Sequence, residues 1–570
     1  MGDHDSTAEA LKAALTEAAL NLGAEGVQVR LERPRDPEHG DVTSNVAMTL
    51  AKQLGKSPRE IASSMAEAVR VLPGVTSVEV AGPGFLNVRF DSVELGQVVA
   101  QIRKAHQTWG QSSEGQRKRI MVEFVSANPT GPLHLGHGRQ AALGDGIAAL
   151  LEWTGWDVHR EFYFNDAGNQ MDRLAASVWA RYQEALGHEL ELPVGGYQGE
   201  YVAEIAATFR EENGDRFDSE GAGADPGLRE EGLVLMRDHA VAALRQEQIR
   251  DLEGFGVHFD EFYRESSLYD DGRLESTVRA LKKTGLTYDK DGAVWLKTSD
   301  FGDQKDRVMV KSDGSPTYFL PDVAYHTTKW ERGFEDVINV QGSDHHGTVD
   351  RVRAGLQALG RPRDYPEYVL HRMVTVERGG QVVRFSKRAG SYDTMGELVE
   401  QVGVDVARYF FLMRRPEAHL KFDLDVALDQ SDKNPVYKVQ YAHARMCSIF
   451  TKAKAQGWEG DLSVADAGLL TTPHERELLK QLAEFPGTVS RAARDRAPHI
   501  VCDYMEKTAG LINSWYHAGN PSRSPELAVL VDDKTLSTAR LALSDAVRIV
   551  LRNGLALLGI SAPERMDRAS

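Results

Sequence analysis

The sequence predicts an α/β protein in three parts: a small N-terminal α/β domain, a central parallel β-sheet and a C-terminal all-α helical bundle. Two observations carry this prediction. Strand-like segments are twice followed by a glycine-bearing turn and a helix, which is the order that builds parallel sheets. Beyond about residue 400 the strand patterns fade, and amphipathic helical patterns continue. With 570 residues the chain is too long for one core, at about 150 residues per domain.

Composition and charge narrow the class of protein. With 41% hydrophobic and 26% charged residues the chain resembles an ordinary globular protein. It has no secretory signal and no apolar run of about 18 residues, so we expect a cytoplasmic protein without membrane contact. The net charge of −17 argues against nucleic-acid binding by the whole surface, but a local basic stripe can still bind phosphates. Cys447 and Cys502 are expected to be reduced thiols, and no zinc site is expected.

Residues 1–110 are predicted to form the small α/β domain. Apolar residues at helical spacing predict one helix around residues 11–22 and another after Pro58. Alternating or apolar segments predict strands, which are 27–31, 75–80 and 85–90. Nothing in this domain has the spacing of catalytic residues, so a binding or packing role is expected. The polar residues 111–119 are predicted to be a linker.

Residues 118–395 are predicted to carry the sheet. Strand, helix and strand follow one another between 118 and 164, and the sheet resumes at 337–341 before another glycine turn and helix. Residues 165–300 are mostly helical and acidic, which predicts an insertion between the halves of the sheet, with a mobile loop at 211–227. A hairpin at 374–383 then presents a basic loop.

Residues 400–570 are predicted to form the helical bundle. Its amphipathic segments are 404–415, 436–452, 474–494, 498–515 and 535–558.

The turn at 128–137 is the first candidate for chemistry. It joins the first strand of the sheet to a helix, where free backbone N–H groups and the helix dipole favour a phosphate. His134 and His137 are three residues apart on one helix face, and Gly136 leaves room for a flat ring against the backbone. Neutral or protonated imidazoles there can donate hydrogen bonds to phosphate oxygens during a displacement at phosphorus. Metal ligation by the two histidines needs a third ligand and is the weaker alternative.

Two later segments are predicted to meet this turn. Lys387 lies in the basic loop 384–390 and can close over a triphosphate as a point charge, with a solvated basic turn as the alternative. Asp344, His345 and His346 follow the strand at 337–341. Adjacent side chains point in different directions, so an active-site turn is favoured over a metal site.

Five segments together resemble, in the same order, the signature elements of the class Ia arginyl-tRNA synthetase family. They are 122–139, 165–170, 342–347, 386–390 and 434–445. The resemblance extends from about residue 40 to Met566. It implies a Rossmann-type catalytic domain that makes arginyl-adenylate from arginine and ATP, with Mg²⁺. The arginyl group then passes to the 2′-OH of the terminal ribose of tRNA(Arg). It also implies a monomer whose amino-acid activation needs bound tRNA.

The resemblance assigns the two flanking domains to tRNA. Residues 1–110 resemble the family's domain that contacts the D-loop, and residues 400–570 resemble its anticodon-binding domain. Aromatic side chains there could stack on unpaired bases, with Tyr504, Trp515 and Tyr516 as candidates, although a core position is the more frequent fate of such residues.

The resemblance also implies individual roles. ATP binding is assigned to His134, Gly136, His137, Ser386 and Lys387, with His134, His137 and Lys387 catalytic. Residues 384–388 occupy the place of the family's K-M-S-K-S loop but depart from that pattern, because Arg384 replaces its first Lys and Arg388 replaces its final Ser. Arginine binding is assigned to Glu123, Ser126, Asn128, His137, Tyr318, Asp322 and Gln341. The chemistry agrees, since a guanidinium prefers planar carboxylate partners such as Glu123 and Asp322.

Two alternatives stay open at this point. A different H-x-G-H nucleotidyl transferase would not need a helical bundle of this size. A non-catalytic tRNA-binding paralogue would not need intact His134, His137, Lys387, Glu123 and Asp322.

Overall fold

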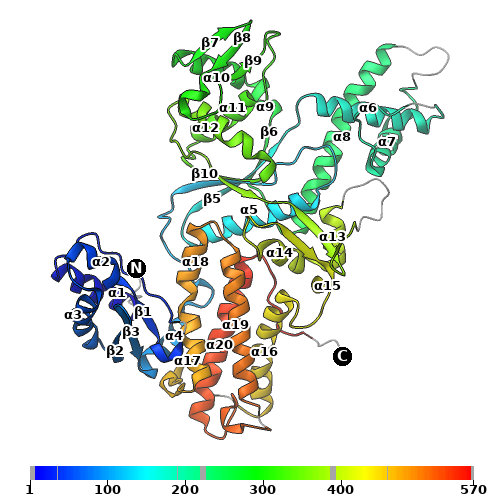
Figure 1. Cartoon of the computed structure of the whole chain (residues 1–570). Helices are drawn as coiled ribbons and strands as arrows, with labels where there is room; N and C mark the ends of the chain where they lie inside the picture. Colours follow the sequence, from blue (N-terminus) through cyan, green and yellow to red (C-terminus); the bar gives the residue numbers. More distant parts are fainter. Residues whose placement is uncertain are drawn as a thin grey trace.

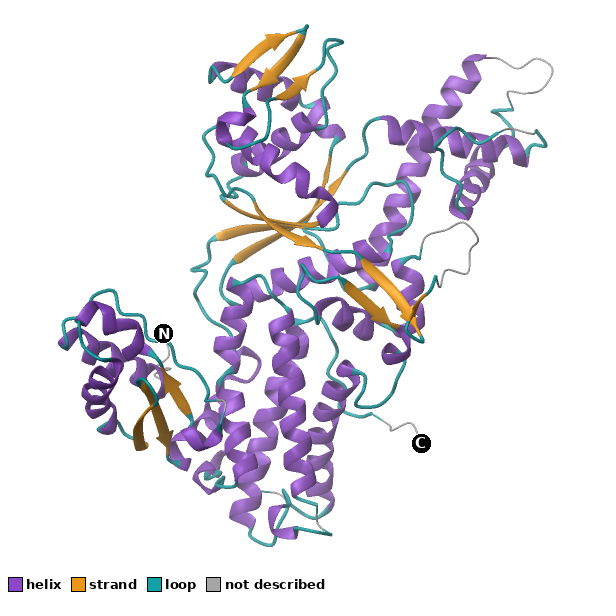
Figure 2. Cartoon of the chain, in the orientation of Figure 1, coloured by secondary structure: helices purple, strands orange, loops and turns teal. Residues whose placement is uncertain are grey.

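The computed structural model describes residues 7–34, 36–188, 191–218, 226–384, 393–458, 460–520 and 522–566. The central sheet lies above the long helices of the bundle, and the N-terminal domain lies beside the bundle (Figure 1). Two lobes project from the sheet, one mostly helical and one carrying a small sheet of its own (Figure 2). Among the described residues, no helix combines the length and apolar character needed to cross a membrane.

The central sheet confirms the predicted parallel architecture. Its five strands are all parallel and have the order β11–β10–β4–β5–β6. They are β4 (Arg119–Glu123), β5 (Asp157–Phe164), β6 (Glu261–Arg264), β10 (Asp336–Gly342) and β11 (Glu367–His371). Because the chain leaves β4 toward β5 on one side and returns to β10 on the other, the strand order reverses at β4. In open α/β sheets, ligands bind at the carboxyl end of such a reversal.

Helices cover both faces of this sheet. α5 (Leu135–Trp153) packs on one face, against Val122, Phe124 and Val340. Gly144 permits this close approach, since a Cβ at that position would lie 2.1 Å from the Phe124 side chain. The other face is covered by α10 (Arg273–Lys283), α11 (Phe319–Glu331) and α12 (His346–Ala358). Side chains alternate along β4, so Met121 and Glu123 point toward the α11 side.

The insertion is helical, as predicted, up to Gly254. It consists of α6 (Asn169–Ala185), α7 (Glu200–Asn213) and α8 (Pro226–Gly254), which share a separate core. Of the predicted loop 211–227, residues 219–225 lie outside the described residues.

Strands that the sequence pattern did not predict follow α8. β6 joins the central sheet after α8, and α9 (Ser266–Asp270) comes next. A small antiparallel sheet then forms from β7 (Thr287–Lys290), β8 (Ala293–Leu296) and β9 (Arg307–Val310). These strands are four residues long, which is too short for a periodicity to stand out. Three of them, β6, β7 and β8, lie within residues 165–300, where the sequence predicted a mostly helical insertion.

The predicted hairpin is present after the main sheet. β12 (Val374–Arg378) pairs antiparallel with β13 (Gln381–Val382) and parallel with β14 (Leu420–Asp423). Between them lie α13 (Met395–Val402) and α14 (Val404–Leu412), and α15 (Leu424–Ala427) follows.

The N-terminal domain has its own core and a three-stranded antiparallel sheet. Its elements are α1 (Thr7–Asn21), β1 (Val42–Ser44), α2 (Val46–Leu54), α3 (Pro58–Arg70), β2 (Val75–Ala81), β3 (Phe85–Phe90) and α4 (Ser92–Ala105). The strand predicted at 27–31 is wrong. This segment alternates but has no ladder, and only its neighbour Glu32 forms an isolated bridge, with Thr43.

The bundle agrees closely with four of the five predicted segments, but the segment predicted at 404–415 is α14, which lies between β13 and β14 and not in the bundle. The bundle consists of α16 (Pro435–Ala455), α17 (Pro473–Ala483), α18 (Phe485–Arg494), α19 (His499–Ala518) and α20 (Lys534–Leu557). The predicted helix 474–494 is two helices, because Pro486 stands in the first turn of α18 and cannot continue the hydrogen-bond ladder of α17. The bundle shares one continuous core with the α5 face of the sheet.

Candidate active site

A cavity of about 1430 Å³ opens at the carboxyl end of β4. Four predicted site residues line it, namely Ser126, Asn128, His134 and His137. Its walls also include residues 196–201 and two residues of α8 from the insertion, residues of α13, and residues of the β12–β13 hairpin. The site that the sequence predicted at this turn is therefore a cavity between the sheet, the insertion and α13.

His134 and His137 form an unusual N-terminal cap on α5. His134 Nδ1 accepts hydrogen bonds from the backbone N–H groups of Gly136 (3.0 Å) and His137 (3.3 Å), and His137 Nδ1 accepts from His134 N (3.3 Å). The rings stack, with centroids 3.6 Å apart. Gly136 is required by this stack, because a Cβ there would lie 2.8 Å from His134 Cε1.

This cap determines the protonation of both imidazoles. An Nδ1 that accepts a backbone N–H carries no proton, so the proton of each neutral ring is on Nε2. Burial lowers the pKa of His134, and burial with the neighbouring His134 and His371 lowers the pKa of His137 to about 3. Both rings are thus neutral at pH 7. Each can offer one Nε2–H to a phosphate oxygen, which decides between the two protonation states that the sequence left open.

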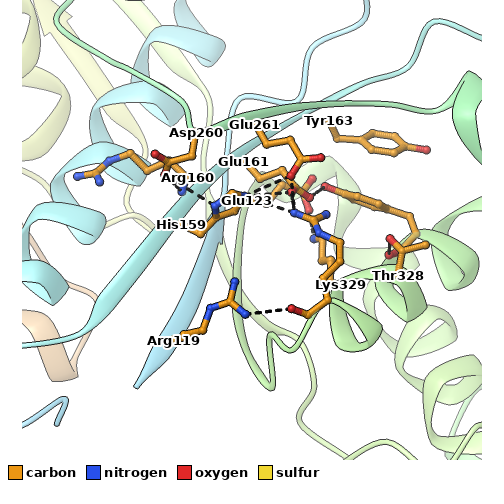
Figure 3. A network of polar contacts seen from close by, with 12 residues as sticks. Arg119, Glu123, His159, Arg160, Glu161, Tyr163, Asp260, Glu261, Thr328 and Lys329 are labelled. Carbon is orange, nitrogen blue, oxygen red and sulfur yellow. Dashed lines mark hydrogen bonds and ion pairs between the residues drawn. The ribbon is translucent and has the colours of Figure 1, made fainter. Parts of the chain in front are cut away.

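A row of polar side chains crosses the sheet beside this turn. Asn339, Glu123, Glu161 and Glu261 are neighbours in register on four adjacent strands and share one face of the sheet. Figure 3 shows the three carboxylates of this row close together, with Lys329 beside Glu123.

Two cations at the C-terminal end of α11 neutralise part of the row. Lys329 is fully buried, forms an ion pair with Glu123 and donates to Asn339 Oδ1 at 3.2 Å. Arg332, the residue that follows the last turn of α11, pairs with Glu161 and with Glu261 (2.7 Å). Although burial alone would raise it, hydrogen bonds from His159 and Arg332 hold the pKa of Glu161 down at about 2.

His159, Glu161 and Glu261 lie close enough together to suggest a metal site. The Arg332 guanidinium occupies that position instead, because its NH2 group contacts both carboxylates and lies 3.3 Å from His159 Nε2. We therefore interpret the cluster as an ion-pair network.

Glu123 is positioned more tightly than the sequence suggested. It is only 3% exposed, and its second oxygen accepts a 2.9 Å hydrogen bond from Ser126 Oγ. The chain bends sharply to bring this hydroxyl back, with φ of 69° at Val125 and 45° at Ser126. Glu123 is thus already paired, and its role toward arginine stays a prediction.

Asp322 is the carboxylate that this network leaves without a partner. It lies in the first turn of α11 and makes no hydrogen bond or ion pair with any described residue. Burial, together with the carboxylates of Glu265 and Glu123, raises the pKa of Asp322 to about 7. A cationic ligand beside this carboxyl group would stabilise its charged form and lower its pKa, so Asp322 is a candidate for binding a cation.

Glu265 is a candidate that sequence reasoning missed. It is buried, accepts a 2.9 Å hydrogen bond from Tyr163 Oη, and its pKa is raised by burial. No motif marks it, because it follows the short strand β6. Glu265 becomes a candidate for the site only because the fold brings its carboxylate close to Asp322.

The remaining predicted residues fall in different places. Gln341 is half-buried near the end of β10, and Tyr318 is 85% exposed, four residues before Asp322. Their contacts with arginine stay predictions. His345 lines the cavity, which places the turn after β10 at the site. Ser386 and Lys387 lie outside the described residues, whereas Arg384 lines the cavity.

Replacing Lys329 by methionine should lower the free energy of unfolding by about 3–5 kcal/mol, because Glu123 would keep a buried charge without its counter-ion. Thermal and urea unfolding measure the change. The exposed Lys283→Met is the control and should be nearly neutral. Adding Glu123→Gln to Lys329→Met should restore part of the loss. Unchanged unfolding of Lys329→Met would contradict the pairing.

Comparison with known proteins agrees with this geometry. Three family models match: "Arginyl tRNA synthetase N terminal domain" at 5–90, "tRNA synthetases class I (R), catalytic domain" at 97–409 and "DALR anticodon binding domain" at 439–566. The parallel sheet with its histidine turn thus belongs to a class I tRNA synthetase.

Individual relatives narrow the class further. The chain is 48% identical to an arginine–tRNA ligase from Thiobacillus denitrificans, covering 97% of this chain and 98% of that one. It is 50% identical to that of Bordetella avium, covering 94% and 95%. The solved arginyl-tRNA synthetase of Thermus thermophilus has the same fold, with a TM-score of 0.74 and 24% identity over 98% of this chain and 100% of that one. The chain belongs to the arginyl-tRNA synthetase family.

Proposed function

We propose that this chain is an arginine–tRNA ligase. It activates arginine with ATP to arginyl-adenylate, releasing pyrophosphate, and then transfers the arginyl group to the 2′-OH of the terminal adenosine of tRNA(Arg), releasing AMP. The observation that carries the proposal is the unpartnered, half-buried Asp322 beside Glu265 and Glu123. Its negative charge is the complement of a guanidinium, although Asp322 lies in the first turn of α11 and is not among the residues that line the cavity beside the histidine pair.

In this proposal the turn joins the two substrates. Asp322 receives the guanidinium, while Ser126 and Asn128 hold the main-chain groups of arginine. The arginine carboxylate attacks the α-phosphorus of ATP, and pyrophosphate leaves. His134 and His137 donate from Nε2 to the phosphate oxygens as negative charge builds on them. Ser386 and Lys387 are assigned to the same phosphates on the resemblance alone.

The surroundings of the reaction are proposals as well. We expect Mg²⁺ to enter with the ATP phosphates, as it usually does in nucleotide enzymes, and assign it no protein ligand. We expect a cytoplasmic monomer.

The two flanking domains are proposed to bind tRNA. Tyr504 and Trp515 are buried in the bundle core, so they are unsuited to stacking on bases. Tyr516 is half-buried, and the Arg445 guanidinium lies 4.5 Å from its ring centre and 4.8 Å from that of Tyr441. Because Arg445 is itself buried, the half-buried Tyr516 is the one of the three candidates that we keep for stacking on an unpaired base.

The decisive experiment is ATP–pyrophosphate exchange by the purified protein, with and without arginine and tRNA(Arg). We expect exchange only when both are present. No exchange by folded protein that still binds tRNA would support the non-catalytic paralogue and refute the proposal. Exchange with another small substrate in place of arginine would support a different nucleotidyl transferase.

A further inference from the structure

The substrate turn at 128–131 is held from outside the sheet by the helical insertion. One side chain from each insertion helix takes part, and the three are Gln170 of α6, Tyr201 of α7 and Gln248 of α8. The insertion is therefore in direct contact with the residues proposed to bind arginine, although Figure 1 shows most of it projecting away from the sheet.

Gln248 makes the most specific of these contacts. Its side chain is 1% exposed, and Nε2 donates to the backbone oxygens of Asn128 (3.0 Å) and Gly131 (2.9 Å). Its Oε1 is buried without a hydrogen-bond partner among the described residues. Turning the amide over would place Oε1 against two carbonyl oxygens, so the two acceptors fix its orientation.

The other two contacts fix the rest of the turn. Tyr201 Oη donates to Thr130 O at 2.7 Å, and Asn128 Nδ2 donates to Gln170 Oε1 at 2.7 Å. Asn128 is thereby fixed at its carbonyl by α8 and at its side chain by α6.

The turn depends on these contacts because few hydrogen bonds form within the turn itself. It follows two residues with positive φ, and within 128–131 the only local backbone hydrogen bond joins Thr130 N to Asn128 O. Its carbonyls must find partners elsewhere once they are buried. A shift of about 1 Å in such a substrate-positioning segment can change a reaction rate by about a hundredfold.

We propose that Gln170, Tyr201 and Gln248 are positioning residues, through which the helical insertion sets the geometry of the arginine-binding turn. The inference rests on the proposed function, since it concerns the rate of arginine activation. The histidine pair is anchored separately, by its own cap and by the hydrogen bond from Met395 N to Leu133 O (2.7 Å). The insertion thus acts on the arginine side of the turn more than on the ATP side.

Two matched tyrosine variants test this. Tyr201→Phe removes a hydroxyl that donates to the turn, whereas Tyr182→Phe removes one that donates, also at 2.7 Å, to Gly214 O within the insertion. Exchange assays should show kcat/KM for arginine reduced about three- to tenfold by Tyr201→Phe, the equivalent of one hydrogen bond, with KM for ATP within about twofold. Tyr182→Phe should leave both within about twofold. Equal effects of the two variants would overturn the proposal.

Gln248→Met provides a second test through coupling. It removes both donations to the turn, so its effect and that of Tyr201→Phe should not add, because the two side chains hold the same four residues. Additive losses, or losses that merely follow a lowered unfolding temperature, would contradict a positioning role. The wild-type protein distinguishes failure of the proposed function from failure of this inference. If the wild-type protein shows no exchange, the proposed function is refuted. If the wild-type protein shows exchange and Tyr201→Phe is unaffected, only the positioning role is refuted.

Discussion

Replacing His137 by alanine is expected to slow arginine-dependent ATP–pyrophosphate exchange by about a hundredfold or more. The side chain supplies one of two Nε2–H donors at the start of α5, and loss of one such donor to a developing oxyanion typically costs this much. Affinity for tRNA(Arg), measured by filter binding, should stay within about twofold, because the bundle and the N-terminal domain are proposed to hold most of the tRNA.

The cap made by His137 calls for a second variant. His137→Gln can still accept the N–H of His134, as glutamine does at this helical position, but it lacks the imidazole. Both variants should be slow, and only His137→Ala should also lower the unfolding temperature. His258, which is exposed and does not line the cavity, gives the control His258→Ala. Equal loss of exchange and tRNA binding in the His137 variants would refute the catalytic role.

The second large effect is expected at Asp322. Asp322→Asn keeps the shape of the side chain and removes the charge that a guanidinium would meet, so KM for arginine should rise about a hundredfold or more. KM for ATP should change far less. Exchange kinetics at varied arginine and varied ATP measure both values, and Asp313→Asn, an exposed change on the same lobe, is the control. A larger effect on ATP than on arginine would refute the assignment.

The raised pKa of Asp322 adds a pH dependence. Below about pH 7 the carboxyl is protonated and neutral, so kcat/KM for arginine should rise with pH up to about 7 and then level off. His137 does not obscure this rise, because burial lowers its pKa to about 3. The Asp322→Asn variant should lack it.

Stability should change with pH in the opposite direction. Since the folded pKa of Asp322 is above its ordinary value of 3.8, the folded state favours the protonated acid, and stability is lost as the pH rises from about 4 toward 7. Asp322→Asn should therefore melt at a higher temperature than the wild-type protein at pH 8, with little difference near pH 4. In many proteins, charged groups in a binding site lower the stability of the folded protein when no ligand is bound.

Much of the fold follows from local sequence patterns. The order of strands and helices around β4, α5, β5 and β10 predicted the parallel sheet, because alternation and helical spacing are properties of adjacent residues. The same reasoning failed at 27–31, which alternates but lies beside no partner strand, and at β6, which is four residues long. Pairing depends on distant residues that no local pattern contains.

The site divides in the same way. The turn with His134 and His137 can be recognised from the sequence, because a cap and its helix are neighbours in the chain. The folded arrangement was needed to show that both rings are neutral donors, that Lys329 pairs with Glu123, and that Asp322 is unpaired near Glu265. These states depend on burial and on charges brought together from β4, β6 and α11, and burial exists only once the chain has folded.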